Sequence, residues 1–200
     1  MRDISKEEII LENDRVLLRP LLPEDAAHLL PFSMDEAAIW TYSLLSPAGG
    51  KEQLDHYIEV TYKSRLEGKE YPFIIFDKKY NEYAGSTRFY DINYPYTTTQ
   101  FGYTWYGSKF QRTGLNRNCK KLILEFAFEN WGVERVEFRA DSNNQPSIHA
   151  MKNIGCTVEG ILRSNMPTRD PEVRRDSIVL SILKHEWTNT VKRRLSAKIY

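Results

Sequence analysis

The region around residues 105–132 constrains the fold more than any other part of the chain, because a strand, a loop and a long helix follow one another there. Its sequence is WYGSKFQRTGLNRNCKKLILEFAFENWG. Apolar side chains recur in it at helical spacing and predict a buried stripe made of Leu115, Cys119, Leu122, Ile123, Phe126 and Ala127. We expect this helix to begin after a loop over 107–114 and to end at Gly132.

Strands and helices follow in mixed order through the rest of the chain. Alternating or apolar runs predict strands at 16–19, 72–76, 83–90, 99–106, 134–140, 157–163 and 174–183. Helices are expected after Pro23, over 54–68, from Asn144 to Gly155 and over 185–195. Because such an order needs crossovers, it predicts an α/β fold whose sheet is mixed in direction and covered by helices.

Alternation within two strands predicts which side chains share a face. Phe101, Tyr103 and Trp105 occupy alternate positions and are expected on one face of their strand. In the strand at 134–140 the positions expected to point inward are Val136, Phe138 and Ala140.

Composition favours a single domain over residues 1–200. Apolar residues make up 41% and charged residues 28% of the chain, and no repeat or linker interrupts it. The net charge of +1 supplies no global attraction to nucleic acid or to acidic membranes. No stretch approaches the ~20 apolar residues that span a bilayer, and the first residues lack the pattern of a secretory signal. We therefore expect a cytoplasmic protein without a membrane or nucleic-acid partner.

The cysteines and histidines do not form a metal-binding pattern. Cys119 and Cys156 stand far apart and outside any metal-ligand spacing, and the four histidines show none either. Two reduced thiols and no metal are expected. Cys119 lies on the apolar helix stripe, which favours packing over a role as nucleophile.

The loop before the long helix is suited to an anion. The first N–H groups of a helix lack internal partners and point out of its positive end, where a phosphate gains hydrogen bonds and a favourable field. Gly114 allows close approach of a ligand to the backbone, and Arg112 and Lys109 can add charge. The same sequence also fits an ordinary strand–loop–helix connection that binds nothing.

Gln111-Arg112-Thr113-Gly114-Leu115-Asn116 resembles the Q/R-x-x-G-x-G/A pyrophosphate loop of the GNAT acetyltransferase superfamily, with Asn116 where glycine or alanine is usual. Three longer stretches resemble the RimJ/RimL branch, which acetylates N-termini of ribosomal proteins: VLLRPLLPEDAAHL, AFENWGVERVEFRADSNNQPSIHAMKNIGCTVEGILR and RRDSIVLSILKHEW. Together they cover nearly the whole chain. The resemblance implies a mixed, mostly antiparallel twisted sheet of about seven strands, with a core over about 12–183 and a helical tail over 184–200.

The resemblance also implies where acetyl-CoA would bind. The strand ending near Trp105 and the strand at 134–140 would splay apart and admit the pantetheine arm as an added strand. Backbone near Tyr103 and Trp105 would donate to the thioester oxygen. Asn144 and the helix that it opens would contact the cofactor, although Asn144 also fits a plain helix cap. The pyrophosphate would be held by the backbone of Gln111, Arg112, Thr113, Gly114, Leu115 and Asn116.

Direct transfer needs a base for the amine, donors for the developing oxyanion and an acid for the thiolate. Many GNAT enzymes use a tyrosine as the acid, but the matching position here is Met151. Ser147 is the nearest hydroxyl and could hydrogen-bond the CoA sulfur, or it could simply belong to the first helical turn. Gln100 stands where the branch often has a glutamate. The base candidates are then Asp91, Glu159 or a water chain without any essential carboxylate.

These features predict an N-acetyltransferase, monomeric or homodimeric, that moves an acetyl group from acetyl-CoA to a protein N-terminus or a small-molecule amine. Loops at Ser43–Lys51 and Tyr94–Thr99 are expected to set the choice of acceptor. The alternative is a GNAT-fold module that binds CoA or acetyl-CoA without turnover. A P-loop nucleotide-binding protein is excluded, because no GxxxxGK[ST] motif occurs.

Overall fold

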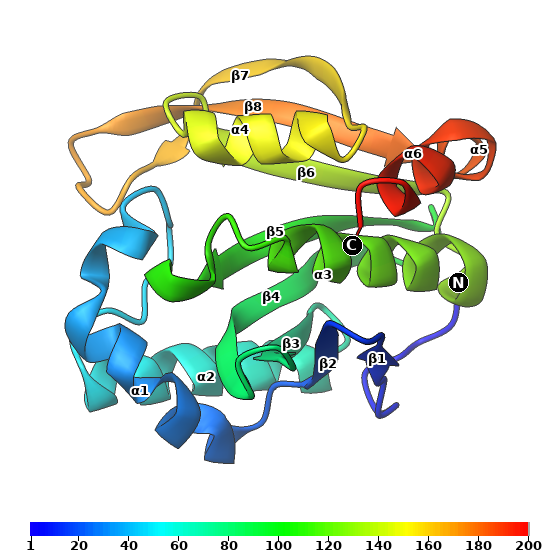
Figure 1. The fold of residues 1–200 in the computed structure, drawn as a ribbon. Helices are drawn as coiled ribbons and strands as arrows, with labels where there is room; N and C mark the ends of the chain where they lie inside the picture. Colours follow the sequence, from blue (N-terminus) through cyan, green and yellow to red (C-terminus); the bar gives the residue numbers. More distant parts are fainter. Residues whose placement is uncertain (200) are drawn as a thin grey trace.

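The computed structural model describes residues 1–199, and its centre is one twisted eight-stranded sheet (Figure 1). The strands lie in the order β1-β2-β3-β4-β5-β6-β8-β7, and every neighbouring pair is antiparallel except β5 and β6. Their bounds are β1 Leu11–Glu12, β2 Val16–Pro20, β3 Tyr71–Asp77, β4 Glu82–Asn93, β5 Thr98–Tyr106, β6 Arg135–Asp141, β7 Thr157–Pro167 and β8 Arg174–Leu183. The predicted mixed α/β fold is confirmed, with the two-residue β1 added to the seven expected strands.

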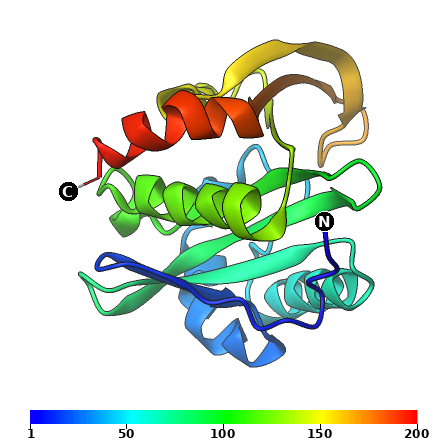
Figure 2. The same cartoon turned by 90° about the vertical axis from the view of Figure 1, so that its right-hand side faces the viewer.

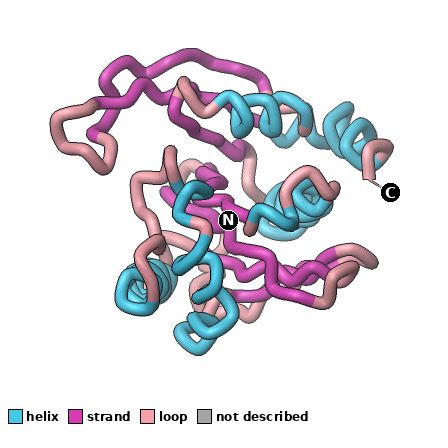
Figure 3. The backbone as a smooth tube through the Cα atoms, turned by 60° about the vertical axis from the view of Figure 1, so that its left-hand side comes forward, coloured by secondary structure: helices cyan, strands magenta, loops and turns pink. Residues whose placement is uncertain are grey.

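Helices cover both faces of this sheet, as Figures 2 and 3 show from two further directions. Their bounds are α1 Ala26–Asp35, α2 Lys51–Leu66, α3 Leu115–Glu125, α4 Gln145–Asn153, α5 Lys184–Glu186 and α6 Lys192–Ser196. On one face a large apolar cluster combines buried residues of α3, α4 and the C-terminal helices with those of the sheet. On the other face a smaller cluster joins α1 and α2 to Ile74 and Trp105.

The long helix follows its sequence pattern closely. Leu115, Cys119 and Ile123 are buried on the sheet side, and the helix continues as a π-helical segment over Phe126–Trp131. Gly132 ends it with φ 84°, a left-handed conformation that costs a glycine little. The C-terminal segment is helical as its pattern predicts. Trp187 and Leu195 pack into the large cluster together with α3.

The expectation that Phe101, Tyr103 and Trp105 share one face is wrong. Strand β5 carries a bulge: Arg88 of β4 pairs with Gly102, whereas Ser86, two residues earlier, pairs with Trp105. The extra residue in β5 reverses the alternation beyond it, and Tyr103 takes a positive φ of 47° there. Phe101 therefore lies in the large cluster, while Trp105 lies in the smaller cluster on the opposite face.

Strands β5 and β6 diverge, as the resemblance implied. Their parallel pairing covers only three positions, from Thr98 opposite Arg135 to Gln100 opposite Glu137. Beyond Gln100 the remaining residues of β5 have no paired partner in β6. Val136, Phe138 and Ala140 of β6 are buried, as their alternation predicted. The divergence leaves free backbone edges on both strands in the middle of the sheet.

Candidate active site between strands β5 and β6

The space between the diverging strands is a cleft of about 830 Å³. Its lining comes from β5 and β6, the start of α3, the first turns of α4, the end of β4 and the loop after Trp40. Both polar and apolar side chains face it. A cleft of this size is large enough for a cofactor-sized ligand.

The start of α3 forms one part of the cleft lining. Gly114 caps the helix with φ 89°, and a Cβ placed on it would meet no atom within 4 Å. Within residues 1–199, no acceptor lies in hydrogen-bond range of the amides of Arg112, Thr113, Gly114 and Asn116. The open space and the free amides fit a phosphate group at this helix end.

Of the six residues predicted to bind pyrophosphate, two line the cleft. Gln111 and Asn116 line it, and each is tied to Tyr106: Gln111 Nε2 donates to the Tyr106 carbonyl at 3.1 Å, and the Tyr106 hydroxyl donates to Asn116 Oδ1 at 3.2 Å. The Thr113 hydroxyl instead donates to the Phe110 carbonyl at 2.7 Å. The side chain of Leu115 is fully buried in the large cluster, so that only its backbone can face a ligand.

The start of α4 forms another part of the cleft lining. Asn144 caps this helix, since its Oδ1 accepts from the Ser147 amide at 3.2 Å, and it also lines the cleft. Ser147 lines the cleft from the first turn, and its hydroxyl has no hydrogen-bond partner among the described residues. Met151, at the position where many enzymes of the resembling superfamily have a tyrosine, is buried and reaches the same cleft.

The bulge in β5 places Tyr103 and Trp105 at the cleft in different ways. The Tyr103 ring lies 3.8 Å from the Arg88 guanidinium carbon, and Tyr90 packs edge-on against it. Trp105 packs against Trp40 in the smaller cluster, so only part of it reaches the cleft. Backbone between Gly102 and Trp105 is released from regular pairing with β4 and is available to a ligand.

Sequence reasoning missed a carboxylate in the cleft, Glu70, which directly precedes β3. Arg88 Nη1 donates to Glu70 Oε2 at 2.7 Å and also to the Thr61 hydroxyl at 2.7 Å. Burial raises the pKa of Glu70, while the adjacent Arg88 acts in the opposite direction without cancelling the shift. Only its place in the folded structure marks Glu70, because its sequence neighbourhood contains no motif.

Of the two carboxylates that the sequence suggests as the base, one lines the cleft and the other does not. Asp91 lines the cleft and accepts a hydrogen bond from Gln100 Nε2 at 2.8 Å. Glu159 does not line it: this residue lies on β7, where Arg135 and the Ser181 hydroxyl bind its carboxylate. That ion pair lowers the pKa of Glu159, which makes it a poor base.

Lys120 is the second residue that the sequence did not single out. It belongs to the buried side of α3, is only 6% exposed and lines the cleft. Its ammonium nitrogen lies 4.1 Å from the centre of the Phe101 ring and 3.5 Å from the Thr104 hydroxyl. Burial lowers its pKa to about 8. Beside it, burial raises the pKa of the Cys119 thiol to about 12, which agrees with the packing role expected for that cysteine.

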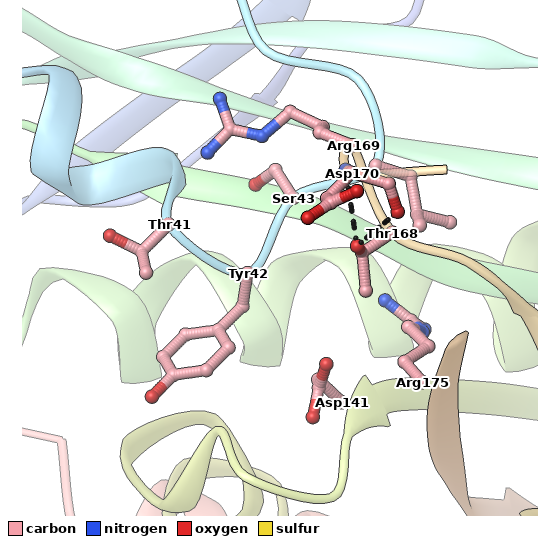
Figure 4. A pocket seen from close by; sticks show the side chains of 9 residues that line it. Thr41, Tyr42, Ser43, Asp141, Thr168, Arg169, Asp170 and Arg175 are labelled. Atoms are coloured by element: carbon pink, nitrogen blue, oxygen red, sulfur yellow. Dashed lines mark hydrogen bonds between the residues drawn. The ribbon is translucent and has the colours of Figure 1, made fainter. Parts of the chain in front are cut away.

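A second, smaller hollow of about 200 Å³ adjoins the cleft (Figure 4). The loop after Trp40 supplies Thr41, Tyr42 and Ser43, and the hairpin between β7 and β8 supplies the residues that face them. Ser43 and Leu44, at the start of the loop Ser43–Lys51, line this hollow, and the role of the loop in choosing the acceptor stays a prediction. None of the residues Tyr94–Thr99 lines the cleft or the hollow, and the Tyr94 hydroxyl is turned toward Asp3 and Gly68. Thr168, Arg169 and Asp170 between β7 and β8 line the smaller hollow instead.

Within residues 1–199, no group of three or more His, Cys, Asp or Glu side chains is placed to hold a metal ion. The described helices also include none whose length and apolar character would let it cross a bilayer.

Comparison with known proteins gives the same picture as the geometry. A family model described as the acetyltransferase (GNAT) domain matches residues 15–157. An uncharacterised N-acetyltransferase of Bacillus licheniformis, p20, is 24% identical over 177 residues, covering 88% of this chain and 97% of its own. A GCN5-related N-acetyltransferase of Brucella melitensis superposes with a TM-score of 0.88 at 23% identity, over 96% of this chain and 86% of that chain. RimJ of Mycobacterium smegmatis, solved in complex with CoA-disulfide, gives 0.79 at 19% identity over 95% and 93%.

The fold and the cleft define an α/β protein of the acyltransferase type, with a splayed strand pair beside a helix N-terminus. The family match extends over more than half of the chain, and the chain therefore belongs to the GNAT acetyltransferase family. It is an acyl-CoA-dependent acetyltransferase, and the resemblance noted in its sequence is confirmed at the level of family and fold.

Proposed function

We propose that this protein transfers an acetyl group from acetyl-CoA to a primary amine by direct attack in the cleft between β5 and β6. One observation carries the proposal: a single cleft joins the start of α3, where the Asn116 amide has no acceptor within residues 1–199, to a half-buried carboxylate, Glu70. A CoA-binding module that performs no chemistry would need the amides but has no use for the carboxylate. We also propose that a single domain, with its core over 12–183, performs this activity.

The amides of Arg112, Thr113, Gly114 and Asn116 are suited to hold the pyrophosphate, and Gln111 and Leu115 support this loop from either side. The unpaired edges of β5 and β6 can bond the pantetheine arm as an added strand does. Tyr103 and Trp105 bracket the released backbone that would donate to the thioester oxygen. Asn144 and Ser147 border the same space from α4. The solved RimJ relative binds a CoA derivative on the same fold.

In the reaction, Glu70 accepts the proton that the attacking amine loses. Its raised pKa and its place in the cleft suit a base, and the Arg88 ion pair holds the carboxylate in position. Ser147, whose hydroxyl has no hydrogen-bond partner among residues 1–199, donates a hydrogen bond to the sulfur of the leaving group. Asp91 stays a secondary candidate for the base, since it shares the cleft.

The acceptor would enter through the hollow between the loop after Trp40 and the β7–β8 hairpin. A protein N-terminus suits the RimJ/RimL resemblance, and a small amine is the other acceptor to test. The test measures release of the free CoA thiol from acetyl-CoA with peptides that have free N-termini and with small amines. Steady release with any acceptor supports the proposal. Tight binding of acetyl-CoA without release across both panels would instead identify a non-catalytic module.

A further inference from the structure

Lys120 presents a buried positive charge to the cleft. No salt bridge among residues 1–199 involves it, although its residue exposure is only 6%. Its ammonium group contacts the faces of Phe101 and Phe138, at 4.1 and 5.2 Å from the ring centres, and has the Thr104 hydroxyl at 3.5 Å. Aromatic faces and one long hydrogen bond replace little of the hydration that the charge has lost.

The surroundings of Lys120 do not neutralise this charge. Cys119 on α3 and Cys156 before β7 are its thiol neighbours, and burial raises the pKa of each to about 12, so both are uncharged near neutral pH. The remaining ionisable groups that line the cleft come from other elements: Tyr42, Glu70, Tyr90, Asp91, Tyr103, Tyr106, Arg139, Asp141 and Arg175. None of these carboxylates forms a salt bridge with Lys120. A structural lysine at such a site would normally be paired or would extend into water.

We infer that Lys120 is the acid of the reaction, whose ammonium group receives the sulfur of CoA as the thiolate leaves. This inference rests on the proposed function and assigns a role that Ser147 cannot fill. The pKa of a serine hydroxyl lies far above that of a thiol, so Ser147 can orient the sulfur but cannot protonate it. The pKa of Lys120, about 8, is close to the ~8.5 of a free alkyl thiol. Proton transfer between such matched groups is favourable in either direction.

The proton and electron count closes. The amine nitrogen forms the new C–N bond, and its proton passes to Glu70. The C–S bond breaks, and its electron pair stays on sulfur. Lys120 then donates a proton to sulfur and becomes a neutral amine. Loss of a proton from Glu70 to solvent and gain of one by Lys120 restore both groups, so the net products are an amide and the CoA thiol.

The test uses CoA itself and follows thiolate absorbance in the ultraviolet against pH. In the wild-type complex the thiol pKa should fall by at least one unit, which means at least tenfold more thiolate at neutral pH than in free CoA. Lys120→Met should abolish this shift. Lys121→Met is the matched control, because Lys121 is the next residue on α3 but pairs with Glu125 at 3.2 Å. It should behave as the wild type does.

Lys120→Arg keeps the charge but cannot give up a proton. The variant should keep a lowered thiol pKa and lose at least tenfold in kcat. If the role of Lys120 were purely structural, kcat and the thiol pKa would change only when the stability of the protein changed. If Lys120→Met does not fold, the wild-type protein alone tests the inference. It should bind CoA more tightly than desulfo-CoA, and the ratio of the two affinities should grow between about pH 6.5 and 8. An unshifted thiol pKa in a wild-type complex that still turns over acetyl-CoA overturns this inference and leaves the proposed function intact. Failure of CoA to bind at all overturns both.

Discussion

Among single residues, Glu70 shows how opposing effects set the chemistry of the cleft. Removal from water disfavours its charged form, and the ion pair with Arg88 favours it. Desolvation is the larger effect, so the pKa lies above its ordinary value. Arg88 is itself held by Thr61 and packs on Tyr103, which fixes the carboxylate at the wall of the cleft. A base must be ionised to accept a proton, and activity should therefore be lost as the pH falls through this raised pKa.

Glu70→Gln should lower kcat by roughly 10²-fold or more, the usual contribution of a positioned general base. The acidic limb of the pH–rate profile should disappear with it, because the group that titrates is gone. Initial rates of thiol release across pH measure both effects. The control is Glu159→Gln, which removes a carboxylate outside the cleft and should keep wild-type rates and the limb. Equal profiles for Glu70→Gln and the wild type would remove Glu70 from the mechanism.

Ser147→Ala should lower kcat more than it weakens binding of acetyl-CoA. The hydroxyl has no partner among the described residues, and the helix cap uses the Ser147 amide rather than its side chain, so folding should be nearly unaffected. Steady-state kinetics together with calorimetric titration separate the two quantities. A variant with wild-type kcat would show that Ser147 only begins the helix.

At the scale of elements, the bulge in β5 decides what the cleft contains. It turns Trp105 away from the face that Phe101 occupies and frees backbone between Gly102 and Trp105. The partner strand makes room for it at Gly85, where a Cβ would lie 2.1 Å from the Trp105 carbonyl oxygen. That oxygen belongs to the backbone and cannot move aside without breaking the β4–β5 pairing.

Gly85→Ala should therefore destabilise the protein by about 3 kcal/mol. Gly160→Ala is the matched control, because Gly160 also lies in a strand at a high positive φ, 159° against 152°, but has no atom within 4 Å of its Cβ position. Its cost should be limited to backbone strain of about 1 kcal/mol. Chemical denaturation measures both. If the two variants lost equal stability, the close approach of the Trp105 carbonyl to Gly85 would not be the reason why position 85 needs glycine.

The start of α3 allows a comparison in which protein stability and ligand affinity change in opposite directions. Gly114→Asp and Gly114→Asn have the same shape, and both residue types tolerate the left-handed conformation at φ 89° better than others. The added carboxylate favours the helix N-terminus in the free protein but repels a pyrophosphate there. Relative to the Asn variant, the Asp variant should melt higher and bind acetyl-CoA at least about tenfold more weakly. Equal affinities, measured by calorimetry, would place the pyrophosphate elsewhere.

For the molecule as a whole, one sheet separates two apolar layers, and the cleft opens where its two halves diverge. The strands β1 to β5 carry α1 and α2 on one face, and β6 to β8 continue the sheet beyond the divergence (Figure 1). The only parallel pairing within the described residues, between β5 and β6, joins the halves over three positions. Helix α3 packs against the sheet in the large cluster, and both the N-terminus of α3 and its residue Lys120 reach the cleft.

The sequence predicted most of this framework, because periodic burial and helix-end signals are local. The stripe from Leu115 and the caps at Asn144 and Gly132 are examples. The bulge was missed since one inserted residue leaves no mark in an alternating pattern. Glu70 and Lys120 were missed for another reason. The roles proposed for them depend on contacts with residues elsewhere in the chain: Arg88 for Glu70, and Phe101 and Phe138 for Lys120.

The central claim is that acetyl-CoA binds with its pyrophosphate on the free amides at the start of α3. Backbone amide resonances of the labelled protein, recorded during titration with acetyl-CoA, test it directly. The account predicts the largest shifts at Arg112, Thr113, Gly114 and Asn116, with smaller ones along β5 and β6. Saturable binding that leaves these four amide signals in place, while others move, would contradict it.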